Sequence, residues 1–117
     1  MQYMLLIYAN EQLQVGRTEE EQRTEFAKWM DYNKQMTDAG ISWKGDALQP
    51  IATATSVRVR NNENMITDGP FAETKEQLGG YYLIDVDNLD EALKWAARCP
   101  GSAYGTIEVR PVMVFDN

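Results

Sequence analysis

Apolar residues form an almost continuous run near the start of the chain, at residues 3–9. Such a run is typical of a central strand covered on both faces, because a strand with one face in water alternates apolar and polar side chains. Residues 10–17 are polar and include Gly16, so they predict a loop. The first segment therefore predicts a central strand, and other parts of the protein must cover both of its faces.

The apolar pattern then changes to helical spacing. Thr18, followed three residues later by Glu21, forms a capping-box pattern that begins a helix, and Gly40 is a natural end for it. One stripe of this helix is largely apolar, and we expect its tryptophan and methionines to pack in the core. The stripe consists of Phe26, Trp29, Met30, Asn33, Met36 and Thr37.

The middle of the chain predicts strands and turns. Residues 41–48 form a plausible strand interrupted by Gly45, where a bulge is expected, and Pro50 marks its end or an edge position. Residues 56–60 alternate valine and arginine, which places the two residue types on opposite faces. Residues 61–64 predict a turn, and residues 65–67 predict the returning strand of a hairpin.

A second helix and two further strands complete the pattern. Residues 81–86 predict a strand, and Asn88 caps a helix with Glu91 at its third position. Residues 105–114 predict the last long strand, with Ile107 and Val109 on one face and Glu108 and Arg110 on the other. The expected apolar face of the helix, which Pro100 and Gly101 end, contains Leu89, Ala92, Leu93 and Ala96.

The order of elements predicts an α+β fold. It matches the ferredoxin-like β-α-β-β-α-β arrangement with an extra central β-hairpin and an antiparallel sheet, in a single domain spanning residues 1–117. Two helices can cover only one face of such a sheet. Because the first strand is apolar on both sides, we expect a homodimer in which two sheets pack face to face.

Composition narrows the function classes. No segment of the 117 residues approaches the ~20 apolar residues that span a bilayer, and the N-terminal residues lack the basic region of a secretory signal. We therefore expect a cytoplasmic protein with no membrane association. The net charge of −7 and the scattered lysines and arginines argue against direct nucleic-acid binding.

The chain contains no histidine and a single cysteine, Cys99. The absence of histidine removes Ser-His and Cys-His nucleophile pairs, histidine-ligated haem and most catalytic zinc sites. Cys99 follows the second helix among small and apolar residues, and we expect it to be packed rather than reactive. We therefore expect neither a metal site nor a cofactor.

Residues 67–86 contain the most specific local pattern. Asp68, Gly69 and Pro70 predict a turn, and Glu73, Lys75 and Glu76 follow as a mixed-sign cluster before a glycine pair and a strand. Asp68 is the candidate general base, because desolvation in a partly apolar pocket would raise the pKa of a carboxyl group. The alternatives are that Asp68 only braces its turn and that the cluster is a solvated salt-bridge patch.

Further side chains are candidates for holding a substrate. Glu73, Lys75, Arg58 and Arg110 could bind the polar or charged groups of a small organic acid, and Arg110 could instead pair with Asp85 or Glu108. Tyrosine hydroxyls could donate hydrogen bonds or form a binding wall. These tyrosines are Tyr8, Tyr81, Tyr82 and Tyr104.

The ordered motifs identify a family resemblance. The chain resembles the YCII-related family, in particular its branch named for the Asp-Gly-Pro-Phe motif, present here at residues 68–71. The likeness extends over residues 3–8, 52–60, 67–86, 89–93, 99–101 and 108–113. The resemblance implies a dimeric α/β barrel built from ferredoxin-like subunits.

The resemblance implies less about activity. Distant relatives on the same fold include lactone isomerases, cofactor-independent oxygenases and haem proteins, and fold alone does not choose among them. The wider family has a proposed histidine and aspartate pair, whereas this chain has Tyr104 where relatives often carry histidine. We expect either a pocket for a small metabolite with carboxylate-based proton transfer, or a non-catalytic regulatory module. For the latter, the resemblance implies an extracytoplasmic-function sigma factor as partner.

Overall fold

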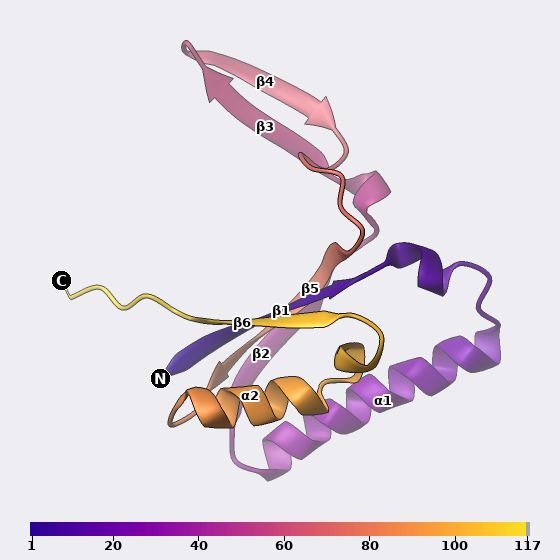
Figure 1. The fold of residues 1–117 in the computed structure, drawn as a ribbon, viewed down its shortest axis with the longest axis vertical. Helices are drawn as coiled ribbons and strands as arrows, with labels where there is room; N and C mark the ends of the chain where they lie inside the picture. The colour runs from indigo at the N-terminus through magenta and orange to yellow at the C-terminus, as the bar shows by residue number, and fades with distance from the viewer. Residues whose placement is uncertain (117) are drawn as a thin grey trace.

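The computed structural model describes residues 1–116 and confirms the predicted order of elements (Figure 1). In chain order they are β1 (Gln2–Ala9), the 3-10 helix η1 (Glu11–Gln14), α1 (Glu19–Asp38), β2 (Ser42–Ala47), η2 (Ile51–Thr53), β3 (Thr55–Arg60), β4 (Glu63–Asp68), β5 (Gln77–Asp85), α2 (Leu89–Arg98), η3 (Pro100–Ala103) and β6 (Thr106–Pro111).

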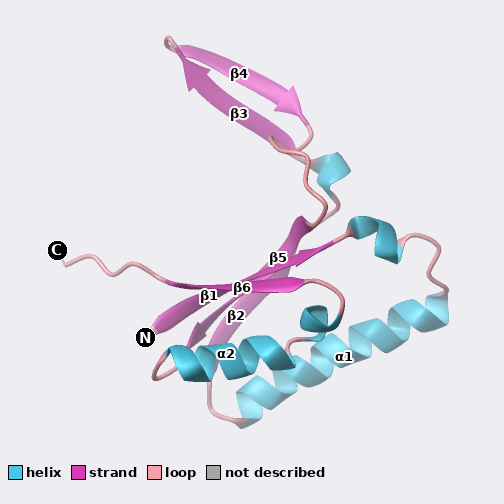
Figure 2. Cartoon of the chain, viewed as in Figure 1, coloured by secondary structure: helices cyan, strands magenta, loops and turns pink. Residues whose placement is uncertain are grey.

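The main body is a four-stranded antiparallel sheet with both helices on one face. The strand order is β2-β5-β1-β6, so β1 is an inner strand as its apolar run predicted. Figure 2 shows α1 and α2 together on one side of this sheet. This arrangement is the α+β, ferredoxin-like architecture expected from the order of elements.

The core lies between the helices and one sheet face. In β1, Tyr3, Leu5 and Ile7 are buried and point towards the helices. The alternate side chains Met4 and Leu6 are half-buried on the other face, which neither α1 nor α2 covers (Figure 1). The helices complete the core with Tyr32, Met36, Ala92, Trp95, Ala96 and, after α2, Cys99.

Cys99 is packed, as expected. Its side chain is 1% exposed, and burial raises the pKa of its thiol to about 11. A thiol in this environment stays protonated near neutral pH and is a poor nucleophile.

The bulge expected at Gly45 lies elsewhere. β2 pairs with β5 without interruption through Gly45, which faces Tyr82. The register shift occurs between β1 and β5, where Ile7 pairs with Gly80 and Tyr8 pairs with Leu78. Gly79 is thus the extra residue, and the glycine pair rather than Gly45 absorbs the irregularity.

The apolar stripes of both helices differ from the prediction. In α2, Trp95 replaces the expected Leu89 and Leu93, which are 46% and 47% exposed, because the buried face is turned towards Trp95 and Ala96. In α1, Met36 is buried as expected, whereas Phe26 is 64% exposed. Trp29 packs against the core as expected, whereas Phe26 and Met30 do not pack in it.

The last strand ends at Pro111 rather than at residue 114, because its neighbour β1 begins at Gln2, whose carbonyl oxygen accepts a final bond from the Val112 N–H at 2.9 Å. β6 is also an edge strand and Arg110 is exposed, so its charge needs no buried partner. The predicted pairing of Arg110 with Asp85 or Glu108 is wrong for the described residues 1–116. Asp85 instead accepts from the N-terminal amine of Met1 at 3.0 Å.

The predicted hairpin is present and projects away from the main sheet (Figure 1). Its turn is shorter than expected, because Asn61 and Asn62 both have positive φ and reverse the chain in two residues. Glu63 therefore already belongs to β4. Asp68 lies at the end of β4, paired with Thr55, and Gly69 makes the bend that follows with φ 93°.

Gly45 and Gly79 provide a matched test of this packing. A Cβ at Gly45 would lie 2.6 Å from the Tyr81 carbonyl oxygen, whereas a Cβ at Gly79 would have its nearest neighbour at 3.9 Å. We expect Gly45→Ala to lower the free energy of unfolding by about 1–3 kcal/mol. Gly79→Ala should leave it unchanged or raise it by up to ~1 kcal/mol. Urea denaturation measures both, and equal effects of the two substitutions would contradict the packing described here.

Candidate functional site

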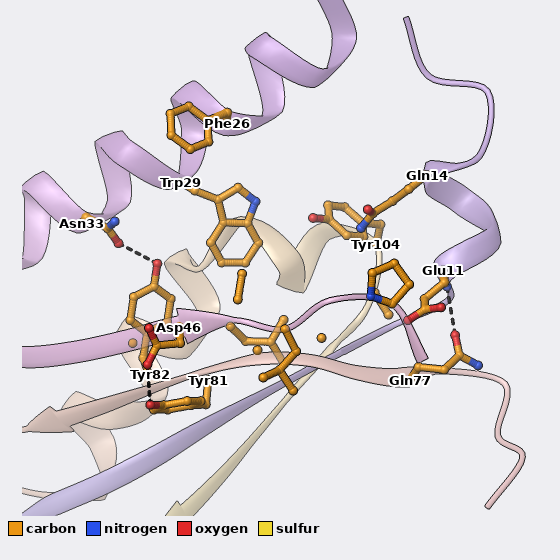
Figure 3. Close-up of a pocket in the computed structure, with 18 of the residues that line it drawn as sticks. Glu11, Gln14, Phe26, Trp29, Asn33, Asp46, Gln77, Tyr81, Tyr82 and Tyr104 are labelled. Carbon is orange, nitrogen blue, oxygen red and sulfur yellow. Dashed lines mark hydrogen bonds between the residues drawn. The ribbon is translucent and has the colours of Figure 1, made fainter. Parts of the chain in front are cut away.

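A pocket of about 690 Å³ lies between α1 and the part of the sheet formed by β2 and β5 (Figure 3). One end is closed by η1 and by the segment that follows β2. Its volume is in the range of pockets that hold small organic molecules.

The floor of the pocket is made of small residues. Gly45 and Ala47 of β2 and Gly80 of β5 occupy the sheet positions that face α1. A side chain at Gly80 is sterically excluded, because its Cβ would lie 2.8 Å from the carbonyl oxygen of Asp46. The helix therefore passes over a sheet surface without side chains long enough to fill the space.

The roof comes from α1. Phe26, Trp29, Met30 and Asn33 line the pocket at the spacing of one helical face. They are the first part of the apolar stripe that the sequence predicted as core. Phe26 and Met30 are exposed because they face the pocket rather than other side chains.

Tyr82 joins the pocket to the core. Its ring lies over Gly45 and stacks on Trp29, with ring centroids 6.3 Å apart, while Trp43 meets it edge-on at 5.7 Å. The Tyr82 hydroxyl donates to Asn33 Oδ1 at 2.6 Å. This bond occupies the oxygen of the Asn33 amide and leaves its NH2 group as a donor beside the pocket (Figure 3).

Glu25 holds two aromatic side chains of the pocket, Tyr104 and Trp29, in position by hydrogen bonds. Its Oε1 accepts from the Tyr104 hydroxyl at 2.7 Å and from the Trp29 indole N–H at 3.3 Å. The Glu25 side chain is only 18% exposed. Burial, followed by the bond to Glu25, raises the pKa of Tyr104 to about 12, so this phenol remains a donor near neutral pH.

The closed end of the pocket contains Glu11. Its backbone N–H donates to Gln77 Oε1 at 3.0 Å, and its carboxylate accepts from the Ile51 N–H at 3.1 Å. These bonds join η1 to β5, as Figure 3 shows, and to η2. The carboxylate therefore lies in a fixed position beside the pocket.

Asp46 also borders the pocket but belongs mainly to the opposite sheet face. It pairs with Tyr81, whose hydroxyl donates to Asp46 Oδ2 at 2.6 Å. Strand alternation places these two side chains on the face opposite that of Gly45 and Tyr82.

The predicted site residues do not lie together in the structure. Tyr81, Tyr82 and Tyr104 line the pocket, whereas none of the predicted charged residues does. Tyr82 and Tyr104 therefore meet at one site on the helix side of the sheet, whereas Tyr81 borders the pocket from the opposite sheet face and Tyr8 of β1 lies outside it.

The other predicted residues lie outside the pocket. Arg58 and Asp68 are exposed in the hairpin, and Glu73 and Lys75 are exposed in the segment before β5. Tyr8 of β1 and Arg110 of β6 lie on the sheet face that points away from the helices. Within one chain, Asp68 and Arg110 are thus on separate sheets, and their roles remain predictions.

Sequence reasoning missed Glu11, Glu25 and the pocket-facing role of Asn33. For Asn33 a signal was present, because an amide inside an otherwise apolar stripe indicates a position that needs a polar partner. Glu25 precedes Trp29 by four residues, which places both on one helical face. Glu11 carried no comparable signal, since its contacts come from distant segments.

The pocket offers aromatic surfaces, neutral hydrogen-bonding groups and the Glu11 carboxylate for binding. Protonated phenols, amides and two indoles surround it, and Glu25 and Glu11 are held by hydrogen bonds. Among residues 1–116, no group of three or more acidic or cysteine side chains could hold a metal ion. No helix of this part of the chain is long and apolar enough to cross a membrane.

The buried phenols predict a loss of stability in alkaline solution. Burial raises the pKa of both Tyr82 and Tyr104 from 10.0 to about 12. The folded protein therefore keeps protons that the unfolded chain loses above pH 10, and unfolding releases them. We expect the urea midpoint to be constant between about pH 7 and 9 and to fall as the pH rises from 10 to 12. The double variant Tyr82→Phe, Tyr104→Phe should show a smaller fall, and an equal fall in both proteins would contradict this account.

Comparison with known proteins agrees with the fold. The model of the YCII-related domain matches residues 1–116. The chain is also 35% identical over 117 residues to the uncharacterised protein R00369 of Rhizobium meliloti (strain 1021), covering 98% of this chain and 94% of that protein. This chain therefore belongs to the YCII-related family.

Proposed function

We propose that the pocket beneath α1 binds a small ring-containing metabolite. The observation that carries this proposal is the exposure of Phe26 and Met30 above a floor of Gly45 and Gly80. Apolar side chains directed into an unfilled space of this size are typical of a ligand pocket. A planar ring would cover them and remove their surface from water.

The rigid setting of the pocket supports this proposal. The floor belongs to paired strands, and the roof belongs to a helix of 20 residues that begins with a complete capping box. The Tyr82 and Asn33 side chains are held by their mutual hydrogen bond. A ligand would therefore meet preorganised groups, which lowers the entropic cost of binding.

The sequence predicted a site for an organic acid, but this pocket suits an organic acid poorly. The lining includes no lysine or arginine among the described residues. Arg58, Lys75 and Arg110, the cations expected to hold an acid, lie outside it. Proton transfer by Asp68 on an acid would need a second site, because Asp68 lies outside this pocket.

We also propose a homodimer. The uncovered sheet face carries the half-buried side chains of Met4, Leu6 and Leu83. The projecting hairpin exposes Val57 and Ile66, which are directly paired and 63% and 67% exposed. These surfaces support association with a second chain. They equally suit the alternative function, a non-catalytic interaction module.

Ligand binding predicts separate effects on affinity and stability. We first identify a compound that raises the melting temperature from a panel of phenols, lactones and ring-containing amines. Phe26→Ala should weaken its binding about tenfold by removing apolar contact area. It should change the free energy of unfolding by less than about 0.5 kcal/mol, since Phe26 is not in the core. Calorimetry and urea denaturation measure the two quantities.

Leu93→Ala is the matched control for Phe26→Ala, because Leu93 is also an exposed apolar side chain of a helix but does not line the pocket. Its affinity should equal that of the wild type. The proposal fails if no compound stabilises the protein, or if both substitutions weaken binding equally.

The dimer proposal predicts the mass in solution. Light scattering at micromolar concentration should give twice the chain mass of 13.3 kDa. Val57→Asp with Ile66→Asp would place charges on the exposed hairpin patch and should shift the mass towards one chain if the hairpin takes part. A wild-type mass of one chain would overturn the proposal.

A further inference from the structure

We propose that the pocket discriminates by charge: for one ring system it binds a cationic derivative most tightly, the neutral derivative less tightly and the anionic derivative least. This inference rests on the proposed function, because it names the class of ligand that the same pocket takes. The ligand class is a planar ring with a short side chain that ends in an ammonium or similar cationic group.

The charges around the pocket carry the first part of the argument. Glu11 and Asp46 are the ionisable acids of the lining, and no lysine or arginine lines it among residues 1–116. Two described cations, one on α1 and one before it, already have partners, and neither lines the pocket. Lys28 lies 3.8 Å from Glu25 Oε2, and the Arg17 guanidinium lies 5.8 Å from the centre of the Tyr104 ring.

The carboxylate of Glu11 is placed to receive a cation. It is half-buried at the closed end of the pocket, and its position is fixed by the Ile51 N–H. An ionised carboxylate can accept about four hydrogen bonds, so the single N–H donor leaves most of this capacity unused. A cationic side chain of a ligand whose ring lies under α1 would find its counter-charge there.

The aromatic walls favour the same sign of charge. Phe26, Trp29, Trp43 and Tyr82 surround the pocket, and the face of an aromatic ring carries partial negative charge. Such faces attract cations and repel anions. The ring surfaces and Glu11 therefore act in the same direction.

An anionic ligand would be poorly compensated. Its carboxylate would lose water on entering the pocket and would find only neutral donors, such as the NH2 groups of Asn33 and Gln14. Burial of a charge without a counter-charge is unfavourable. The neutral derivative avoids this penalty but gains nothing from Glu11, which places it between the two charged forms.

Three compounds with the same indole ring test this order of binding affinities. At pH 7 tryptamine is a cation, indole-3-ethanol is neutral and indole-3-acetate is an anion. Calorimetric titration of the full chain should give tryptamine an affinity about tenfold or more above that of indole-3-acetate, with indole-3-ethanol between them. The titrations are repeated at 0.5 M NaCl, because salt screens the general attraction of an acidic protein for cations.

Glu11→Gln tests the residue that carries the charge argument. The amide side chain of this variant would keep an oxygen for the Ile51 N–H, so tryptamine affinity should fall while indole-3-ethanol affinity stays the same. Unchanged binding of the neutral compound also shows that the variant is folded. Glu63→Gln, which makes the same charge change on the exposed hairpin, is the control and should alter neither affinity.

The outcomes separate this inference from the proposed function. Indole-3-acetate binding as tightly as tryptamine, or an unchanged preference in Glu11→Gln, would overturn the charge selectivity while leaving a ligand pocket. Absence of binding by all three compounds would also overturn it. The proposed function itself fails on other results: no stabilisation of the protein by the wider panel of ring compounds, or equal weakening of binding by Phe26→Ala and Leu93→Ala.

Discussion

The close approach of the Tyr82 ring to Gly45 is the contact on which the rest of the structure depends. Gly45 faces Tyr82 across the β2–β5 pair, and the ring occupies the place where a Cβ would otherwise lie. An aromatic ring that covers a glycine on the neighbouring strand protects the backbone there and fixes the ring. Trp29, Trp43 and Tyr32 then pack around it, so this one contact links α1 to the edge of the sheet.

The same use of small residues produces the pocket. Beyond Gly45, the sheet positions under α1 are Ala47 and Gly80, and the helix continues above them with Phe26. The apolar stripe of α1 thus has two functions: Met36 and Trp29 pack in or against the core, whereas Phe26 and Met30 face an empty space. Stability and binding depend on different residues of one helix, which is why a substitution of Phe26 can affect affinity alone.

Much of the fold was predictable because its determinants are local. The capping box at Thr18, the alternation in residues 56–60 and the apolar run of β1 each depend on a few neighbouring residues. The pocket was not predictable in this way, since it arises where α1 crosses glycines that are distant in sequence. Alternation also cannot distinguish an edge strand from an inner strand, and the expected partner of Arg110 was wrong for this reason. The ordered matches along the chain indicated the family, whereas the motif that begins at Asp68 starts at the end of the hairpin, away from the pocket.

Methyl resonances of the methionines provide the most direct test of the central claim, that the space beneath α1 is the ligand site. With ¹³C-labelled methionine methyl groups, Met30 reports on the pocket, Met4 on the uncovered sheet face and Met65 on the hairpin. Titration with indole-3-ethanol should shift the Met30 resonance, because the bound ring lies against it, and should leave Met4 and Met65 unchanged. A shift of Met4 or Met65 with Met30 unchanged would place the ligand elsewhere and contradict the account.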